Sequence, residues 1–379
     1  MEINCVKEDL SAGVTAVERI VLTRSTLPII GNVLFEAMKD GLRLSANNLE
    51  MGLEVTIPAK VKQEGSILIP AKTLGGIVSK LPSESISIKA SEKGVVRIAY
   101  KQSNVNINGL PSEEFPVLPK IKEAKTITIE TRTFVDMVKQ TVFSVSQSED
   151  KYVLNGVLFE TGKSSQEKDD SNIRLVATDG YRLAKMGEKI GGNPEKNSVI
   201  VPAKALIEVS RILQGKERGE LKISISNEQI AFKFKDVYMI SRLIQGQFPD
   251  YKQVIPKSSE VKIEADTGLF LDAAERTAVI ASGSSNIVKI NTKDGKLHIL
   301  ANTPDVGSAD EVVESQIKGE GKAPIAFNVR LLTDVLKVID TDKISLEFSG
   351  PVNPGIIRPV NGADYLYIIM PIRTADTTA

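Results

Sequence analysis

The chain of 379 residues is poor in the side chains that build covalent and metal-bound sites. It has one cysteine, Cys5, and one histidine, His298. A single cysteine excludes a disulfide within the chain and a cluster of metal-bound thiolates. A single histidine excludes a metal site with two histidine ligands, and any catalytic triad would depend on it alone. We interpret Cys5 as a small apolar residue of the first strand and His298 as structural, and we expect no metal and no cofactor.

Long apolar runs and a net charge are also missing. No run reaches the length of a membrane span, and the first eight residues lack the basic head and apolar centre of a signal peptide. We therefore expect a cytoplasmic protein with no membrane partner. Because 48 basic residues balance 48 acidic ones, no overall field favours a nucleic-acid partner. Basic and acidic residues number 16 and 14 in 1–125, 20 and 18 in 126–260, and 12 and 16 in 261–379.

What the sequence does contain is a repeat. Residues 43–50, 175–184 and 298–305 are similar, and their alanines Ala46, Ala177 and Ala301 are 131 and 124 residues apart. A second marker, at 67–74, 199–206 and more loosely 324–331, has nearly the same period. Two independent markers in the same order predict three copies of one domain, at 1–125, 126–260 and 261–379. Each copy is large enough to bury a core.

Apolar periodicity predicts an α+β fold. Each copy contains two units of strand, helix and three strands. The six helices are expected to carry apolar faces within 10–21, 74–81, 134–145, 206–213, 270–280 and 332–339. The strands of the first copy are expected at 2–7, 32–37, 42–46, 52–57, 67–69, 85–90, 94–100 and 104–110. In the second copy, strand 174–177 leads into a turn, Thr178-Asp179-Gly180, that should present Tyr181 and Arg182 at a hairpin tip.

An enzyme has little support in the sequence. Residues 156–164 end like a phosphate-binding loop, but five residues separate the two glycines where four are needed, and a polar segment follows instead of a helix. The carboxylate pairs Asp169-Asp170 and Glu113-Glu114 lie among turn residues, where a solvated surface is the simpler interpretation. We expect no catalytic residues.

Five motifs carry a family resemblance. They are Leu-Pro-Ile-Ile-Gly-Asn at 27–32, Leu-Asn-Gly-Val-Leu-Phe-Glu at 154–160, Ala-Thr-Asp-Gly-Tyr-Arg-Leu at 177–183, Gln-Phe-Pro-Asp-Tyr at 247–251 and Met-Pro-Ile-Arg at 370–373. In this order they resemble the bacterial sliding clamp, the beta subunit of DNA polymerase III, over essentially the whole chain. The resemblance implies three clamp domains per subunit, with helices lining a ring and sheets outside.

The resemblance also implies a function. Two subunits would join head to tail around duplex DNA without reading its sequence, and an ATP-dependent clamp loader would open the ring. The clamp would tether the DNA polymerase III catalytic subunit, and a short peptide motif would bring in other DNA polymerases and repair proteins. Twelve helices spaced ~8–10 Å apart would enclose a hole of roughly 20–28 Å, wide enough for a duplex.

Site residues follow from motif positions in the family. DNA contacts are implied for Arg24 and Lys151, although each could be an ordinary solvated residue. A homodimer interface is implied for Lys72, Val105 and Ile107 on one side and Val279, Ile280 and Asp305 on the other. A partner-peptide pocket between the second and third domains is implied for Leu154, Thr178, Gly180, Tyr181, Arg182, Leu183, Pro249, Val254, Asn328, Val352, Ile368, Met370, Pro371 and Arg373. Leu183 and Ile368 could instead be ordinary strand core.

Another interpretation is a repeat-built scaffold that binds only proteins. A DNA clamp should gather basic residues on its helices, and eight fall in or beside them: Arg24, Lys72, Lys80, Lys139, Lys204, Arg211, Arg330 and Lys337. Ordinary surface helices also carry lysine and arginine, so this count alone leaves both interpretations open.

Overall fold

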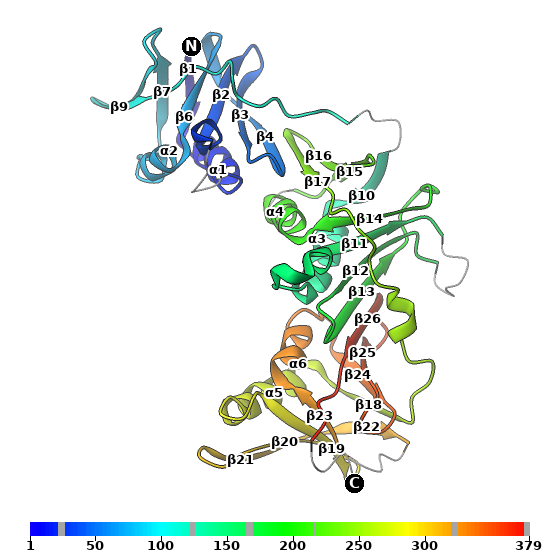
Figure 1. Cartoon of the computed structure of the whole chain (residues 1–379). Coiled ribbons are helices and arrows are strands. Elements are labelled where there is room, and N and C mark those ends of the chain that lie inside the picture. Colours follow the sequence, from blue (N-terminus) through cyan, green and yellow to red (C-terminus); the bar gives the residue numbers. More distant parts are fainter. Residues whose placement is uncertain (22–26, 122–125, 164–169, 215–216, 320–323, 375–379) are drawn as a thin grey trace. The chain divides into compact units, whose positions relative to one another are not determined.

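A computed structural model describes residues 1–21, 27–121, 126–163, 170–214, 217–319 and 324–374 (Figure 1). The chain forms two compact units. One contains Met1–Arg132 with Glu208–Leu243, and the other contains Thr133–Ile207 with Ile244–Ala379. Each unit therefore holds part of the predicted second domain. None of the described helices is long and apolar enough to cross a membrane.

Six α-helices occur among the described residues, two for each sequence repeat, as predicted. They are α1 (Lys7–Glu18), α2 (Ala71–Val78), α3 (Thr131–Thr141), α4 (Ala203–Leu213), α5 (Thr267–Ala281) and α6 (Val329–Leu336). Their apolar stripes face inward: α1 buries Leu10, Val14 and Val17. Within their own units α1 packs against α2, and α5 against α6 (Figure 1).

The described residues of the first unit form two sheets. The smaller has the order β5 (Lys60–Gln63), β1 (Glu2–Val6), β7 (Ser85–Ala90), β8 (Val95–Tyr100), β9 (Ser103–Asn108). The larger has the order β10 (Thr126–Glu130), β15 (Glu220–Ile225), β16 (Gln229–Phe234), β17 (Val237–Arg242), β4 (Met51–Ile57), β3 (Gly41–Asn47), β2 (Asn32–Met38), β6 (Gly65–Pro70). Strands from two predicted domains meet at β17 and β4, where Met239 lies opposite Leu53.

The second unit repeats this plan. Its larger sheet has the order β14 (Asn197–Pro202), β11 (Gly156–Thr161), β12 (Ile173–Thr178), β13 (Arg182–Glu188), β26 (Asp364–Ile369), β25 (Gly355–Pro359), β24 (Lys343–Phe348), β18 (Val261–Asp266), β22 (Ser315–Lys318). Its smaller sheet has the order β21 (Gly307–Val313), β20 (Lys296–Thr303), β19 (Ile287–Lys293), β23 (Ile325–Asn328). Here β13 and β26 join two predicted domains, with Ala184 opposite Tyr367.

The repeated alanines occupy equivalent places in three hairpins. Ala46 pairs with Leu53, Ala177 with Ala184, and Ala301 with Ala309. All three repeated alanines are buried. The first two hairpins have the same register, and the third has one more residue between the paired positions. Counterparts in the three domains are therefore found by following the paired strands.

Candidate functional site

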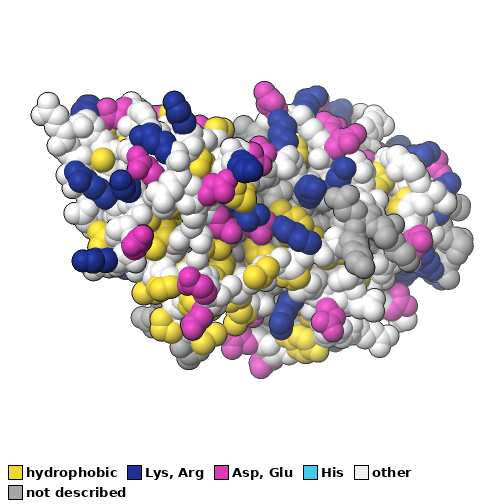
Figure 2. Space-filling view, turned by 90° about the horizontal axis from the view of Figure 1, so that it is seen from above, with side chains coloured by type: hydrophobic (Ala, Val, Ile, Leu, Met, Phe, Trp, Pro, Cys, Tyr) yellow, Lys and Arg dark blue, Asp and Glu magenta, His cyan; other side chains and the backbone are white. Residues whose placement is uncertain are grey.

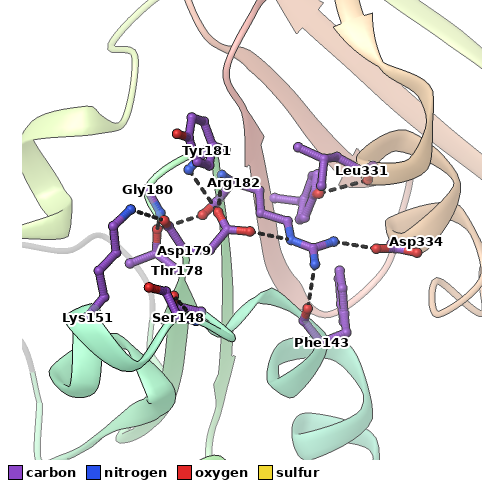
Figure 3. Close-up of polar contacts among 12 residues, drawn as sticks. Phe143, Ser148, Lys151, Thr178, Asp179, Gly180, Tyr181, Arg182, Leu331 and Asp334 are labelled. Atoms are coloured by element: carbon purple, nitrogen blue, oxygen red, sulfur yellow. Dashed lines mark hydrogen bonds and ion pairs between the residues drawn. The ribbon is translucent and has the colours of Figure 1, made fainter. Parts of the chain in front are cut away.

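The connection between β12 and β13 is a tight turn built by its own side chains (Figure 3). The Oδ1 atom of Asp179 accepts hydrogen bonds from the backbone N–H groups of Tyr181 (2.8 Å) and Arg182 (3.0 Å). The Thr178 hydroxyl donates to the Arg182 carbonyl at 2.6 Å. Gly180 has φ +94°, a conformation that favours glycine. The predicted hairpin tip is confirmed, and it leaves Tyr181 65% exposed.

Arg182 ties this turn to two other segments (Figure 3). Its Nε donates to Asp179 Oδ2 at 3.1 Å. Its Nη1 donates to Asp334 Oδ2 on α6 at 2.5 Å, and its Nη2 donates to the Phe143 carbonyl at 2.7 Å. Phe143 lies on the 3-10 helix η3 (Val142–Ser144). Every guanidinium nitrogen is thus engaged within the chain, and the side chain is only 11% exposed.

The C-terminal segment meets the same turn. Across β13 and β26, Leu183 lies opposite Ile368. Immediately after β26, the Met370 N–H donates to the Tyr181 carbonyl at 2.9 Å. The structure therefore brings the motifs at 177–183 and 370–373 together, although they are far apart in the sequence.

An apolar cluster forms beneath the turn. Its buried members are Leu158, Val176, Leu183, Ile200, Tyr251, Ile356, Leu366 and Ile368, with Val153, Ile244, Phe248 and Ile255 partly buried against it. Leu183 and Ile368 retain only 3% and 1% of their exposure. They belong to the strand core, so they can form only the floor of a binding surface.

The other predicted pocket residues offer accessible surface. Tyr181, Val254, Val352 and Met370 are large apolar side chains left exposed. Pro249 and Arg373 are exposed too, while Leu154 and Pro371 are half-buried. Asn328 has a structural role because its Oδ1 accepts from the Arg330 N–H at 3.0 Å and caps α6.

Several residues around the turn were not predicted from the sequence. Phe248 and Tyr251 lie inside the motif at 247–251, which offered a signal for them. No sequence signal pointed to Phe143 or Asp334, because they contact Arg182 across 39 and 152 residues of sequence.

The two predicted DNA contacts differ in what the structure describes. Arg24 lies outside the described residues. Lys151 is on the 3-10 helix η4 (Glu149–Asn155), and its Nζ donates to the Asp179 carbonyl at 3.2 Å. The same Nζ lies 5.4 Å from the centre of the Tyr181 ring. Lys151 therefore contacts the turn at 178–182, which we call the pocket turn because its residues are predicted to line the peptide pocket, and a role in DNA binding stays a prediction.

Seven of the eight basic residues predicted in or beside the helices lie among the described residues, and they divide into two groups. Ion pairs engage Lys139 with Asp340, Arg211 with Glu208, and Lys337 with Glu275. Lys72, Lys80, Lys204 and Arg330 are exposed, and none has an ion-pair partner in the described part of the chain. Figure 2 shows Lys and Arg side chains interspersed with Asp and Glu, in keeping with the balanced net charge.

Residues predicted for a dimer interface lie on two open sheet edges and their helices. On the first side, Val105 is half-buried, Ile107 is buried and Lys72 on α2 is exposed. On the second side, Val279 on α5 is 68% exposed, Ile280 is half-buried and Asp305 is exposed. Nearby acidic groups already have partners: Glu311 binds Arg276, and Asp310 lies 2.9 Å from His298 Nδ1.

The described residues contain neither a candidate metal site nor a reactive thiol. No group of three His, Cys, Asp or Glu side chains among them could hold a metal ion. Burial, followed by the charge of Asp9, raises the pKa of the Cys5 thiol to about 12. Cys5 is therefore a neutral thiol at physiological pH, as its interpretation as a core residue requires.

Family models of the DNA polymerase III beta subunit match nearly the whole chain. The N-terminal domain matches residues 1–119, the central domain 128–250 and the C-terminal domain 252–373. The chain belongs to the beta sliding clamp family. This confirms the resemblance and the three-domain α+β clamp fold. As a sliding clamp it is a non-catalytic processivity factor and not an enzyme.

Relatives of this sliding clamp match along nearly their full length. The beta sliding clamp of Staphylococcus aureus is 30% identical over 365 residues, covering 94% of this chain and 95% of the relative. The sliding clamp structure from Bacillus subtilis has a TM-score of 0.92 at 32% identity, covering 99% of each chain. A sliding clamp structure from Pseudomonas aeruginosa bound to griselimycin has a TM-score of 0.91 at 28% identity, covering 99% of this chain and 100% of that one.

Proposed function

We propose that two copies of this sliding clamp close head to tail into a ring around duplex DNA, binding it without reading its sequence. The observation that carries the proposal is the way domains share sheets. In both larger sheets, the last strand of one domain pairs with the fourth strand of another: β17 with β4, and β26 with β13. Each of these junctions is an antiparallel ladder.

Two equivalent strands have no such partner among the described residues. β9 is the last strand of the first domain and β21 is the fourth strand of the last domain, and each is the terminal strand of its sheet. Pairing β9 with the partner subunit's β21 would complete a third sheet of the same design. Since the two ends of the subunit differ, closing the ring requires this contact twice.

The register of the other two junctions predicts the register of the third. Met239 lies opposite Leu53, and Tyr367 opposite Ala184. By the same hydrogen-bond ladders, their counterparts are Val105 and the partner subunit's Ala309. We infer an interface with Lys72, Val105 and Ile107 on one subunit, and with Val279, Ile280 and Asp305 on the other.

The ring would stay on DNA because it encircles the duplex, and charge contacts with the phosphates would add only weak binding. Balanced net charge and a few unpaired helix cations suit a ring that slides, because tight phosphate binding would slow it. We include Arg24 and Lys151 among the DNA contacts and an ATP-dependent clamp loader among the partners. The domains of the ring are 1–125, 126–260 and 261–379, and the compartment is the cytoplasm.

The pocket around Tyr181, Val254, Val352 and Met370 would capture partner peptides. Exposed apolar side chains above a buried floor can hold apolar anchors of a short peptide. The DNA polymerase III catalytic subunit, the clamp loader, other DNA polymerases and repair proteins are the proposed ligands. Griselimycin-bound relatives support a ligand site in this family.

Loading onto nicked circular DNA tests the ring. The protein would be loaded with the clamp loader and ATP, separated from free protein, and then challenged by cutting the circle with a restriction enzyme. We expect retention on the circle and loss from the linear DNA. Equal retention on both forms would contradict encirclement.

A further inference from the structure

The chain contains an internal control for the pocket turn. In the first domain, the β3–β4 connection holds Asn48 where the second domain has Asp179. Asn48 Oδ1 accepts from the N–H groups of Glu50 (3.0 Å) and Met51 (2.7 Å), as Asp179 does in its own turn. The Arg242 N–H donates to the Glu50 carbonyl at 2.8 Å, which matches the bond from Met370 to Tyr181.

The two turns differ at their last residue. By this register, Met51 stands in the place of Arg182. The turn and its backbone bond to the neighbouring segment therefore form without an arginine. Arg182 must have another role, and its contacts with Asp334 and Phe143 show which segments it joins to the turn.

A second link connects the same segments. The Phe143 ring stacks on Tyr367, with 5.9 Å between centroids and 23° between planes. The Tyr367 hydroxyl donates to the Leu331 carbonyl of α6 at 2.8 Å (Figure 3). Since burial raises the pKa of Tyr367, this hydroxyl stays protonated and remains a donor. Tyr367 therefore connects η3 and α6, the two segments that Arg182 joins to the turn.

We propose that Asp334, which lies on α6 and outside the predicted pocket lining, is a positioning residue for the peptide pocket. Asp334 holds the Arg182 guanidinium, and Arg182 anchors the formed turn, which carries Tyr181, to α6 and to Phe143. The part of the pocket that the second domain contributes then depends on a helix of the third. A preorganised turn lowers the entropic cost of ordering the pocket when a peptide binds. This inference rests on the proposed peptide pocket.

Asp334→Asn tests the role with little change of shape. The probes are griselimycin and a fluorescein-labelled peptide with a glutamine followed by apolar residues, measured on the full chain. We expect about three- to tenfold weaker binding, because a charge-assisted bond to a partly exposed carboxylate is lost. Asp340→Asn is the matched control: Asp340 binds Lys139 at 3.1 Å and does not contact the turn. It should leave affinity within about twofold of the unaltered protein.

A double-mutant cycle tests whether Asp334 acts through Arg182. Arg182→Ala should weaken binding, and Asp334→Asn should add little in that background because the residue through which it acts is gone. Additive effects would overturn the positioning role. Arg182→Lys, which keeps the charge and loses the fork of donors, should fall between the unaltered protein and Arg182→Ala.

Amide exchange separates positioning from general stability. In Asp334→Asn, the N–H groups of Tyr181 and Arg182 should exchange faster, while Asp340→Asn leaves them unchanged. Equal loss of Tm in both asparagine variants, with unchanged affinity for the probes, would contradict the inference. If the unaltered protein bound neither probe, the pocket itself would be wrong, and the positioning role would fall with it.

Discussion

Single residues decide the shape of the pocket turn. Gly180 adopts φ +94°, and a Cβ added there would meet only Lys151 Nζ, at 3.6 Å. Space is therefore available, and the obstacle to a larger residue is backbone conformation. Arg182 is constrained in a second way, by hydrogen bonds to Asp334 and to the Phe143 carbonyl. These partners lie in segments far from Arg182 in the sequence, so no local sequence pattern predicts the contacts.

Gly180→Ala should destabilise the protein modestly. A non-glycine residue in the left-handed region costs roughly 1–2 kcal/mol, and part of that cost is offset because alanine restricts the unfolded chain. Thermal unfolding measures the effect. Gly191→Ala is the control, since its added Cβ meets nothing within 4 Å and no positive φ is recorded there. Equal effects of the two substitutions would argue against backbone strain at Gly180.

Met370→Ala combined with Pro371→Ala should weaken peptide binding by about tenfold or more. Truncating exposed apolar anchors at the centre of an interface commonly costs over ~1 kcal/mol each. Fluorescence anisotropy with the labelled peptide measures the change. Val117→Ala removes exposed apolar surface in the other unit, where Val117 is 89% exposed, and should leave affinity unaltered. Unchanged affinity in the double variant would remove this segment from the pocket.

Elements were largely predictable from local sequence, and their partners were not. The apolar faces within 10–21 and 270–280 gave α1 and α5, because periodic burial is written into each helix. The edge strands β5 and β22 were missed, since Lys-Val-Lys-Gln and Ser-Gln-Ile-Lys have little apolar alternation. The pocket motifs came from resemblance, whereas Asp334 and Phe143 required the fold. Contacts across 152 residues leave no periodic signal.

Helix α5 provides the test of the dimer at the scale of an element. Ile280→Asp would place an unpaired carboxylate in the proposed apolar centre, next to Val279. We expect folded monomers that are not retained on circular DNA. Sedimentation at micromolar concentration measures the assembly, and circular dichroism confirms folding. Leu269→Asp, on an exposed face of the same helix, should remain dimeric. A dimeric Ile280→Asp protein would refute the placement of the interface.

The whole subunit carries its charge unevenly. The first third has 16 basic and 14 acidic residues, and the last third has 12 and 16. Opposite charges at the two ends should favour head-to-tail docking and fix its register.

Dimerisation should therefore weaken as salt rises, by a modest factor. Glu311 is already paired with Arg276 within the chain, which reduces the charge available to a second subunit. Sedimentation equilibrium at several ionic strengths, from about 0.05 to 0.5 M, measures the trend. A dissociation constant independent of salt would remove the electrostatic contribution and leave the apolar interface in place.

The shared sheets have a consequence for how such a ring would come apart. The ladders between β17 and β4 and between β26 and β13 join segments of one chain. The intervening backbone keeps their strands at a high effective concentration, so a broken ladder can re-form quickly. A ladder between β9 and the partner subunit's β21 would have no such tether. Of the three kinds of ladder, the one between subunits would therefore be the one that opens when the ring comes apart.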